Sequence, residues 1–293
     1  MSRTAAGPGR RPFFKLLLKN RLALVGLSLL LLFVFVAVFV PLLAPHEPWQ
    51  QNLRSRLLPP AWLEGGTTAH LLGTDQLGRD VFSRILHGAS VSLQVALIAV
   101  SISTFVGVLL GALAAFYGGW LDNVISGIVD VLLALPAFLL ALAIVAALGP
   151  SIVNVMIAVG IATVPAFARI MRSAVLTVRE MDYVTAAEAV GSRDSRVMLK
   201  HVIPNSLGPV IVQVSLSLAG AILAAAGLSF LGMGAQPPTA EWGSMLNAAR
   251  PYIRDAQWTV TFPGLAIVIT VLALNLVGDG LRDALDPRRV QSE

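Results

Sequence analysis

The stretch LALVGLSLLLLFVFVAVFVPLL, from Leu22 to Leu43, contains 22 residues and no charged side chain. As an α-helix rising 1.5 Å per residue it would reach about 33 Å, which covers a hydrocarbon core of roughly 30 Å. A cleaved signal peptide is the rival interpretation. However, the apolar run is too long for one, and Pro45 follows Ala44, the plausible small residue for cleavage. The stretch therefore predicts an uncleaved membrane anchor.

The composition of the whole chain agrees with a membrane environment. Its 293 residues are 56% hydrophobic and 13% charged, with a mean hydropathy of +0.78, whereas a soluble domain has about 25% charged residues. Without cysteine, the chain has no thiol catalysis, disulfides or thiolate metal sites. The formal net charge of +5 does not indicate nucleic acid, because the basic residues gather at the ends of apolar runs. We expect a lipid bilayer as the surroundings and no nucleic-acid partner.

Further apolar runs predict an all-α, polytopic membrane helical bundle with six transmembrane helices. The short break at Leu148-Gly149-Pro150-Ser151 predicts a hairpin between the third and fourth spans. Proline and glycine punctuate the segment before the second span, which predicts an ordered or semi-ordered external loop. Spans two to six are predicted at Ser92–Phe116, Val124–Leu148, Ile152–Met171, Leu207–Gly232 and Thr259–Gly278.

Lysine and arginine are unevenly divided between the two sides that six spans define. Fifteen lie on the side of the termini and of the 172–205 loop, and six on the other. The positive-inside rule then predicts that both termini and this loop are cytoplasmic. The predicted divisions are a basic tail with the first anchor (1–45), an extracytoplasmic loop (46–89), a transmembrane core (90–280) and a cytoplasmic tail (281–293).

The sequence lacks the signatures of several catalytic sites. No P-loop is present, because the three lysines are followed by Leu16, Asn20 and His201 rather than by serine or threonine. The segment from Gly227 begins like a nucleophile elbow, but Leu231 occupies the last glycine position. The histidines are dispersed along the chain without metal-site spacing and are interpreted as loop or interfacial residues: His46, His70, His87 and His201. We expect no catalytic residue and no metal site.

Asp130 is the one carboxylate that could lie inside a span, where it would suggest a proton or cation relay. The 18 apolar residues from Val131 to Leu148 reach about 27 Å. Asp130 can therefore sit at the cytoplasmic boundary at little cost, and we favour that position.

Small residues and prolines mark helix contacts and kinks. Gly107, Gly111 and Ala115 fall on one helix face and predict close contact with another helix. Pro136 and Pro165 lie within the third and fourth predicted spans, where each removes a backbone donor and could kink the helix. Polar residues inside apolar runs are candidates for the substrate path, although each could equally bond a neighbouring helix: Asn154, Gln213 and Asn275.

The polar segment from Tyr183 to Asn205 predicts two short helices. With Asp182 as N-cap, the first places Tyr183, Ala186, Ala187 and Val190 on one face and Thr185 and Glu188 on another. Gly191 ends this helix, Ser192 caps the second with Asp194 in its first turn, and Pro204 interrupts it before span five. Small residues on such a face let a partner protein approach the backbone, while an ordinary solvated helix pair is the alternative.

At these residues the chain resembles the integral-membrane permease subunits of bacterial ABC importers. Their cytoplasmic loop carries Glu-Ala-Ala, three residues, Gly, nine residues and Ile-x-Leu-Pro. Ala186, Ala187, Gly191, Ile203 and Pro204 match, whereas Thr185 replaces the glutamate and His201 the first isoleucine. Both departures are typical of the peptide branch of the family.

Three further segments resemble the C-type permease of that branch, which serves dipeptide, oligopeptide and nickel importers. The resemblance runs in order from about residue 12 to 289. The segments are His70-Leu71-Leu72-Gly73-Thr74-Asp75 with Gly78-Arg79-Asp80; Gly227 to Gly232 with Gln236-Pro237-Pro238 and Trp242-Gly243; and Asn275 to Asp283 with Leu285-Asp286-Pro287-Arg288.

The resemblance implies a type I ABC importer permease fold in the bacterial cytoplasmic (inner) membrane. It implies pairing with a second, similar permease, two cytoplasmic ATPases that bind ATP and Mg, and an extracytoplasmic substrate-binding protein. The first loop helix would be a coupling helix that docks on an ATPase, and the chain itself would hold no cofactor. The coupling residues implied are Tyr183, Ala186, Ala187, Glu188, Gly191, Pro204 and Asn205.

One departure concerns charge pairing. Gly127 lies near the position where many relatives have an arginine between two aspartates, here Asp122 and Asp130. The resemblance therefore does not carry over a charge pair through that position.

The favoured hypothesis is a permease subunit that imports dipeptides or oligopeptides by alternating access. A nickel or nickel-chelate importer is the alternative within the family, because the binding protein would select the ligand. A proton-coupled secondary transporter is the alternative from another class, and it would normally show more spans and more intramembrane ionisable residues. A pore-forming channel would need a polar filter ring, which the sequence does not show.

Overall fold

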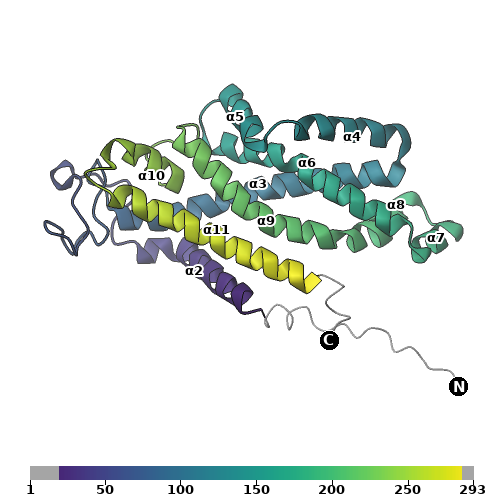
Figure 1. Cartoon of the computed structure of the whole chain (residues 1–293), viewed down its shortest axis with the longest axis horizontal. Helices are drawn as coiled ribbons and strands as arrows, with labels where there is room; N and C mark the ends of the chain where they lie inside the picture. Colours follow the sequence, from purple (N-terminus) through teal and green to yellow (C-terminus); the bar gives the residue numbers. More distant parts are fainter. Residues whose placement is uncertain (1–19, 286–293) are drawn as a thin grey trace, which may run out of the picture.

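The computed structural model describes residues 20–285 as an elongated helical bundle (Figure 1). Within these residues the only β-structure is an isolated bridge between Thr74 and Asp80, so the predicted all-α class is confirmed. Most of the basic N-terminal tail and the last C-terminal residues lie outside the described residues. They include the predicted cytoplasmic charges Arg3, Arg10, Arg11, Lys15, Lys19, Arg288 and Arg289.

The first apolar stretch forms helix α2, Arg21–Leu43. Its N-cap is Asn20, whose side-chain oxygen accepts the backbone N–H groups of Leu22 and Ala23 at 3.1 and 3.2 Å. Most of its large apolar side chains are exposed. The exposed surface of a membrane-length helix is apolar because lipid is its solvent. α2 therefore confirms the first predicted span.

Four further long helices cross the bundle: α3 (Val81–Tyr117), α6 (Ile152–Arg179), α9 (Ile203–Phe230) and α11 (Trp258–Leu285). All four are longer than predicted; α9 begins at Ile203 rather than Leu207, and α11 continues past Gly278. α3 begins at Val81 rather than Ser92, since the Asp80 carboxylate caps it by accepting the Ser83 N–H at 2.7 Å. α6 continues past Met171, so part of the predicted 172–205 loop is helix.

The third predicted span, Val124–Leu148, is wrong as a single helix. The structure has α4 (Gly119–Leu133) and α5 (Ala137–Leu148), which are bent by 91° relative to each other. Pro136 causes the break, because it lacks a backbone N–H and disfavours helical geometry at the residue before it. Pro165, by contrast, lies inside α6 without ending it. Among residues 20–285, five helices could cross a membrane, or six if the bent pair is one span.

The most extensive contact between two helices of the described chain joins α3 to α6. A Cβ atom added at Gly111 would collide with the backbone carbonyl of Ala168, and one added at Gly107 would collide with Phe167. Phe167 and Met171 are fully buried at this contact. The predicted small-residue face is therefore confirmed, because only glycine lets the two backbones come this close.

Helix α10 (Trp242–Ala249) packs one end of the bundle. The indole of Trp242 is fully buried and donates its N–H to the carbonyl of Ile85 at 3.1 Å. The N-cap of α10 is the buried Glu241, whose carboxylate accepts the N–H groups of Gly243 and Ser244 at 2.9 and 2.8 Å. Burial raises the pKa of Glu241, and these two hydrogen bonds oppose the rise.

The loop between α2 and α3 is ordered by buried polar groups. The loop contains a 3₁₀ turn, Leu53–Ser55. A separate 3₁₀ turn, Arg250–Tyr252, follows α10 elsewhere in the chain. The Arg84 guanidinium donates to the carbonyl of Pro48 at 2.8 Å, and Arg79 pairs with Asp75 at 2.7 Å. The indole of Trp258 donates to the carbonyl of Thr74 at 3.0 Å. These bonds join the loop to the starts of α3 and α11.

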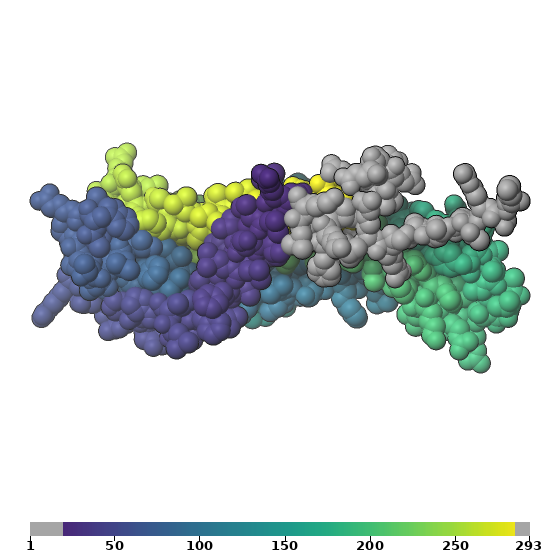
Figure 2. Space-filling view, turned by 90° about the horizontal axis from the view of Figure 1, so that it is seen from below, coloured from purple at the N-terminus to yellow at the C-terminus, as the bar shows by residue number. Residues whose placement is uncertain are grey.

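The described chain begins and ends at the same side of the bundle. The Asn20 amide donates to a carboxylate oxygen of Asp283 at 3.4 Å, which joins the start of α2 to the end of α11. Figure 2 shows the loop before α3 in blue at one end of the molecule and the residues around 182–202 in green at the other.

We predict that Gly111→Leu lowers the thermal stability of the purified chain in detergent. The cost should be about 1–3 kcal/mol, because an added side chain forces α3 and α6 apart. The matched control is Gly127→Leu on α4, where an added Cβ meets no atom within 4 Å. Equal losses of melting temperature in the two variants would contradict a specific contact at Gly111.

Candidate functional site

The predicted coupling segment projects from one end of the bundle, beyond α6 (Figure 1). It consists of α7 (Asp182–Ala189), α8 (Asp194–Val197) and a π-helical turn, Met198–Val202, that leads into α9. The N-caps differ from those predicted. Met181 rather than Asp182 precedes α7, and Arg193 rather than Ser192 precedes α8. Ser192 instead takes part in the end of α7.

Gly191 ends α7 as predicted, with a φ of 77°. Its N–H donates to the carbonyl of Glu188 at 2.9 Å, and the Ser192 N–H donates to the carbonyl of Ala187 at 3.1 Å. This pair of bonds is the Schellman motif, in which a residue with left-handed geometry satisfies the last helical carbonyls. Glycine adopts that geometry without a Cβ penalty. The motif fixes the direction in which the chain leaves α7.

The structure divides the predicted face of α7 into an inner and an outer part. Tyr183 and Val190 are 45% and 81% exposed, and Ala186 is also exposed. Ala187 is half-buried and packs on the bundle core instead. The residue that holds α7 is Val184, which is 1% exposed and which the sequence analysis missed. Its spacing of three residues from Ala187 is the signal that could have identified it.

The prediction that Pro204 interrupts the second helix is wrong. α8, the π-helical turn and α9 run on from one another, and Pro204 occupies the second position of α9. In the π-helical turn the Ile203 N–H bonds the carbonyl of Met198 five residues back. Proline is tolerated at the start of a helix, where its missing N–H costs little. Asn205 donates to the carbonyl of His201 at 2.6 Å, and both Pro204 and Asn205 are exposed.

Arg179, the last residue of α6, joins the end of α6 to the end of α3, just before the chain enters α7. Its guanidinium donates to the carbonyl of Ala115 at 2.9 Å and lies 5.4 Å from the ring centroid of Phe116. Both partners are near the end of α3.

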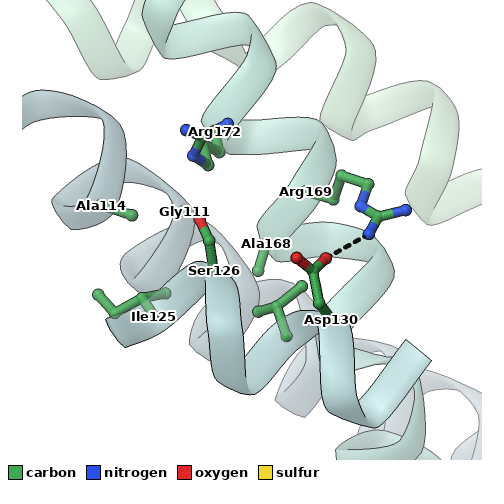
Figure 3. Close-up of a pocket in the computed structure, with 9 residues that line it drawn as sticks. Gly111, Ala114, Ile125, Ser126, Asp130, Ala168, Arg169 and Arg172 are labelled. Atoms are coloured by element: carbon green, nitrogen blue, oxygen red, sulfur yellow. Dashed lines mark hydrogen bonds and ion pairs between the residues drawn. The ribbon is translucent and has the colours of Figure 1, made fainter. Parts of the chain in front are cut away.

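Two ion pairs join α4 to α6 around a cavity of about 410 Å³. Figure 3 shows residues that line this cavity and the pair between Arg169 and Asp130. Arg172 binds Asp122 through two nitrogens, both at 2.6 Å, and Arg169 binds Asp130 at 2.6 Å. The pairing involves α6 arginines, so the glycine at position 127 does not prevent it. Asp130 and Arg169 are both more than 60% exposed. Asp130 therefore lies in an exposed ion pair, which argues against the proton-relay interpretation.

A second cavity, also of about 410 Å³, lies between α5, α6 and α9. Its lining is mostly apolar but includes Gln213, Thr163 and Ser217, and the Gln213 amide donates to the Ser217 hydroxyl at 3.0 Å. Of the three predicted path residues only Gln213 lines this cavity. Asn154 instead donates to the carbonyls of Leu148 and Gly149 at 3.1 and 2.9 Å and closes the turn before α6. Asn275 is half-buried in α11.

The histidines are less dispersed in space than in sequence. His46 and His70 meet at Asp80, at the end of the bundle opposite α7. The prediction of no metal site did not foresee this group.

Comparison with known families identifies this arrangement. A family model described as the binding-protein-dependent transport system inner membrane component matches residues 107–291. The match covers more than half of the chain, including the coupling segment and both cavities. The chain belongs to this family. A second model, described as the N-terminal TM domain of oligopeptide transport permease C, matches residues 11–60 of the permease, which include α2.

Relatives match the permease over nearly its whole length. It is 51% identical over 278 residues to the di/tripeptide transport system permease protein DppC of Pseudomonas aeruginosa (strain UCBPP-PA14), covering 95% of this chain and 92% of the relative. It is 50% identical to the dipeptide transport system permease protein DppC of Escherichia coli (strain K12), covering 93% and 91%. The permease is therefore a multi-pass membrane transport subunit of the ABC importer family.

Solved structures show the same fold. An inward-facing conformation of the MetNI methionine ABC transporter has a TM-score of 0.57 and 16% identity, covering 69% of this chain and 96% of that chain. A crystal structure of an amino acid ABC transporter with histidines has a TM-score of 0.53 and 16% identity, covering 68% of this chain and 92% of that chain. These likenesses confirm the predicted type I importer permease fold.

We predict that the two ion pairs differ in strength. A double-mutant cycle on Asp122→Asn and Arg172→Gln should give a coupling energy approaching about 1 kcal/mol, since the bond is bidentate and half-buried. The same cycle on Asp130→Asn and Arg169→Gln should give about 0.3 kcal/mol or less, because both side chains are exposed. Chemical denaturation of the detergent-solubilised chain measures both. The reverse order would show that burial does not control these pairs.

Proposed function

We propose that the permease imports short peptides, as one half of the membrane pathway of an ATP-driven importer. The observation that carries this proposal is the identity of 48–51% to relatives named as dipeptide or di/tripeptide permeases, over 93–97% of the chain. The partners are a second, similar permease, two ATPases that bind ATP and Mg, and an extracytoplasmic substrate-binding protein. The permease itself contributes no catalytic residue to ATP hydrolysis.

The orientation follows from the charge distribution. Both termini and the coupling segment are proposed to face the cytoplasm, because the basic residues concentrate there. The start of α2 and the end of α11 lie together, which agrees with both termini being on one side. The loop between α2 and α3 then faces outward, toward the binding protein or the partner permease.

α7 is the proposed docking helix for an ATPase. Tyr183, Ala186 and Val190 form its exposed surface, and Gly191 ends the helix in a geometry that keeps this surface accessible. Small side chains such as Ala186 allow a partner backbone to come close. The contacting set also includes Glu188, with Pro204 and Asn205 at the return into α9. Ala187 contributes by packing α7 on the bundle rather than by touching the ATPase.

Movement of the docked α7 would be transmitted to the peptide path through contacts with the bundle. Val184 anchors α7 on the bundle core, and just before α7 the Arg179 bond to Ala115 joins the end of α6 to α3. α6 also lines the cavity that contains Gln213. We propose that this cavity is part of the peptide path. An amide and two hydroxyl groups on an otherwise apolar wall can bond a peptide backbone without holding it tightly.

The docking proposal is tested by reconstituting the permease with its partners in liposomes and measuring ATP-dependent uptake of radiolabelled alanyl-alanine. Ala186→Arg should lower uptake at least about tenfold, since an unpaired charge in a packed interface costs roughly 3 kcal/mol or more. We expect ATPase activity to lose its stimulation by the loaded binding protein. The matched control is Asn123→Arg, an exposed position on α4, which should leave uptake within about twofold of the wild type.

The same preparation separates the alternative functions. Uptake that stops when the proton gradient is collapsed at constant ATP would support the secondary transporter. Uptake of nickel but not of the dipeptide would support the nickel importer. Normal uptake in Ala186→Arg would reject the docking surface while leaving the peptide substrate in place.

The path proposal predicts a separate effect at Gln213. Gln213→Leu should reduce the maximal uptake rate several-fold, on the scale of one lost hydrogen bond of about 1 kcal/mol, with unchanged thermal stability. Asn154→Ala should affect stability rather than uptake, because the Asn154 amide closes the turn before α6. It should lower the melting temperature and leave the uptake rate per folded transporter unchanged. Uptake that is insensitive to Gln213→Leu would remove this residue from the path.

A further inference from the structure

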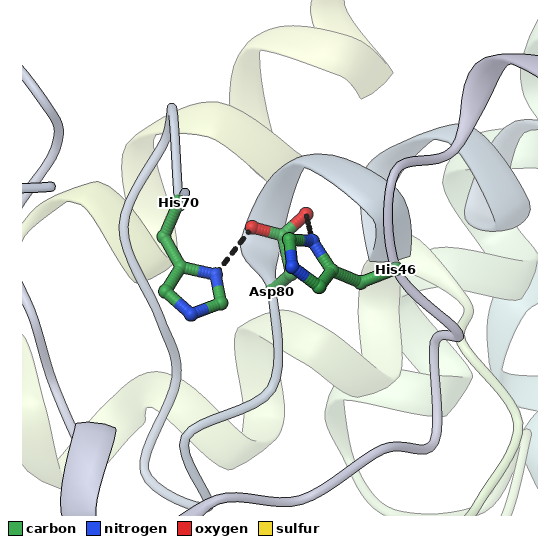
Figure 4. Close-up of side chains that lie close together, drawn as sticks. All are labelled: His46, His70 and Asp80. Atoms are coloured by element: carbon green, nitrogen blue, oxygen red, sulfur yellow. Dashed lines mark hydrogen bonds and ion pairs between the residues drawn. The ribbon is translucent and has the colours of Figure 1, made fainter. Parts of the chain in front are cut away.

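Two histidines and a buried aspartate lie close together where the loop after α2 leads into α3 (Figure 4). His46 follows the end of α2, His70 lies in the loop, and Asp80 caps α3. The Asp80 carboxylate lies 3.0 Å from Nδ1 of His70 and 3.9 Å from Nδ1 of His46. The imidazole ring centroids are 4.8 Å apart. Three segments that are separate in the sequence therefore converge on one carboxylate.

The group leaves one nitrogen without a hydrogen-bond partner. Nδ1 of His46 is buried from solvent and forms no hydrogen bond among the described residues, because 3.9 Å to Asp80 is too long for one. A buried polar atom without a partner costs about 1–3 kcal/mol. Asp80 shows 1% side-chain exposure, so water does not solvate its charge well. Both features are relieved by a cation placed between them.

The donor set suits a divalent transition metal. Imidazole nitrogen and carboxylate oxygen bind Zn²⁺ at about 2.0–2.2 Å, so two ligands in a tetrahedron lie about 3.4 Å apart. One ligand atom from each of the three residues lies within 4.8 Å of the others, and two of the separations, 3.0 and 3.9 Å, bracket that spacing. Small rotations of the rings would complete the geometry. A fourth position would remain for water.

The ligands are also held in place by their surroundings. The Ser83 N–H donates to the Asp80 carboxylate at 2.7 Å, and the Ser83 hydroxyl accepts the backbone N–H of His46 at 3.1 Å. Hydrogen bonds of this kind orient metal ligands and raise affinity. The nearby cations are already engaged, since Arg79 pairs with Asp75, and Arg84 donates to the Pro48 carbonyl. Neither arginine competes with a metal for Asp80.

We propose that His46, His70 and Asp80 bind one divalent transition-metal ion, with Zn²⁺ as the probe. The ion joins the end of α2 to the loop and to the start of α3, and so fixes the outer end of the first helix against the bundle. This site is distinct from the coupling surface and from both cavities. It does not depend on the transported solute, since binding is measured on the permease alone.

The experiment uses the full-length permease in detergent, stripped of metal with a chelator and equilibrated with Zn²⁺. We expect one tightly bound ion per chain and a higher melting temperature with the ion. His46→Gln should weaken binding at least about tenfold. This substitution spares the fold, because the His46 side chain forms no hydrogen bond in the described structure. The matched control is His87→Gln, whose ring bonds the Ser83 carbonyl of its own helix, and it should bind Zn²⁺ like the wild type.

A second variant tests ligation directly. His46→Cys restores a zinc ligand at the same position, so it should recover binding that His46→Gln loses. X-ray absorption at the zinc edge of the wild type should show two imidazole ligands at about 2.0–2.1 Å. The proposal is overturned if the wild type binds no stoichiometric Zn²⁺, if His46→Gln binds like the wild type, or if His87→Gln loses binding equally.

Discussion

The close contact between α3 and α6 positions the ion pairs to α4 and the bonds that join the ends of α3 and α6. Gly107 and Gly111 let the two backbones touch, and the fully buried Phe167 and Met171 fill the space beside them. α6 then presents Arg169 and Arg172 to the aspartates of α4 and places Arg179 against the end of α3. In a bilayer, helices gain little from hiding apolar surface, so backbone contact of this kind is a main source of their association.

The two ends of the bundle are built by different physical means. At the α7 end a short helix is held by the buried Val184 and the half-buried Ala187, which leaves most of its surface exposed. At the opposite end the loop is fixed by the buried ion pair of Arg79 with Asp75, and by the Arg84 guanidinium and the Trp258 indole, which donate to backbone carbonyls. The first arrangement suits a surface that docks a partner. The second suits a rigid cap, to which a metal at His46, His70 and Asp80 would add a further cross-link.

The proposed coupling and transport functions meet in α6. This helix leads directly into the coupling segment, carries both ion-pair arginines and lines the cavity with Gln213. The break at Pro136 places α5 on the wall of that same cavity. α6 therefore joins the coupling segment directly to this cavity.

The sequence by itself determined the helical membrane class, the glycine contact of α3 and the Gly191 stop of α7, because these depend on local hydropathy, side-chain size and backbone geometry. It left open or mispredicted the break at Pro136, the continuity past Pro204, the Val184 anchor and the meeting of His46, His70 and Asp80. Each of these depends on which distant segment lies opposite a residue. Only the tertiary structure decides that. A proline can end one helix or begin another, and a histidine can bind a metal only if other ligands lie beside it.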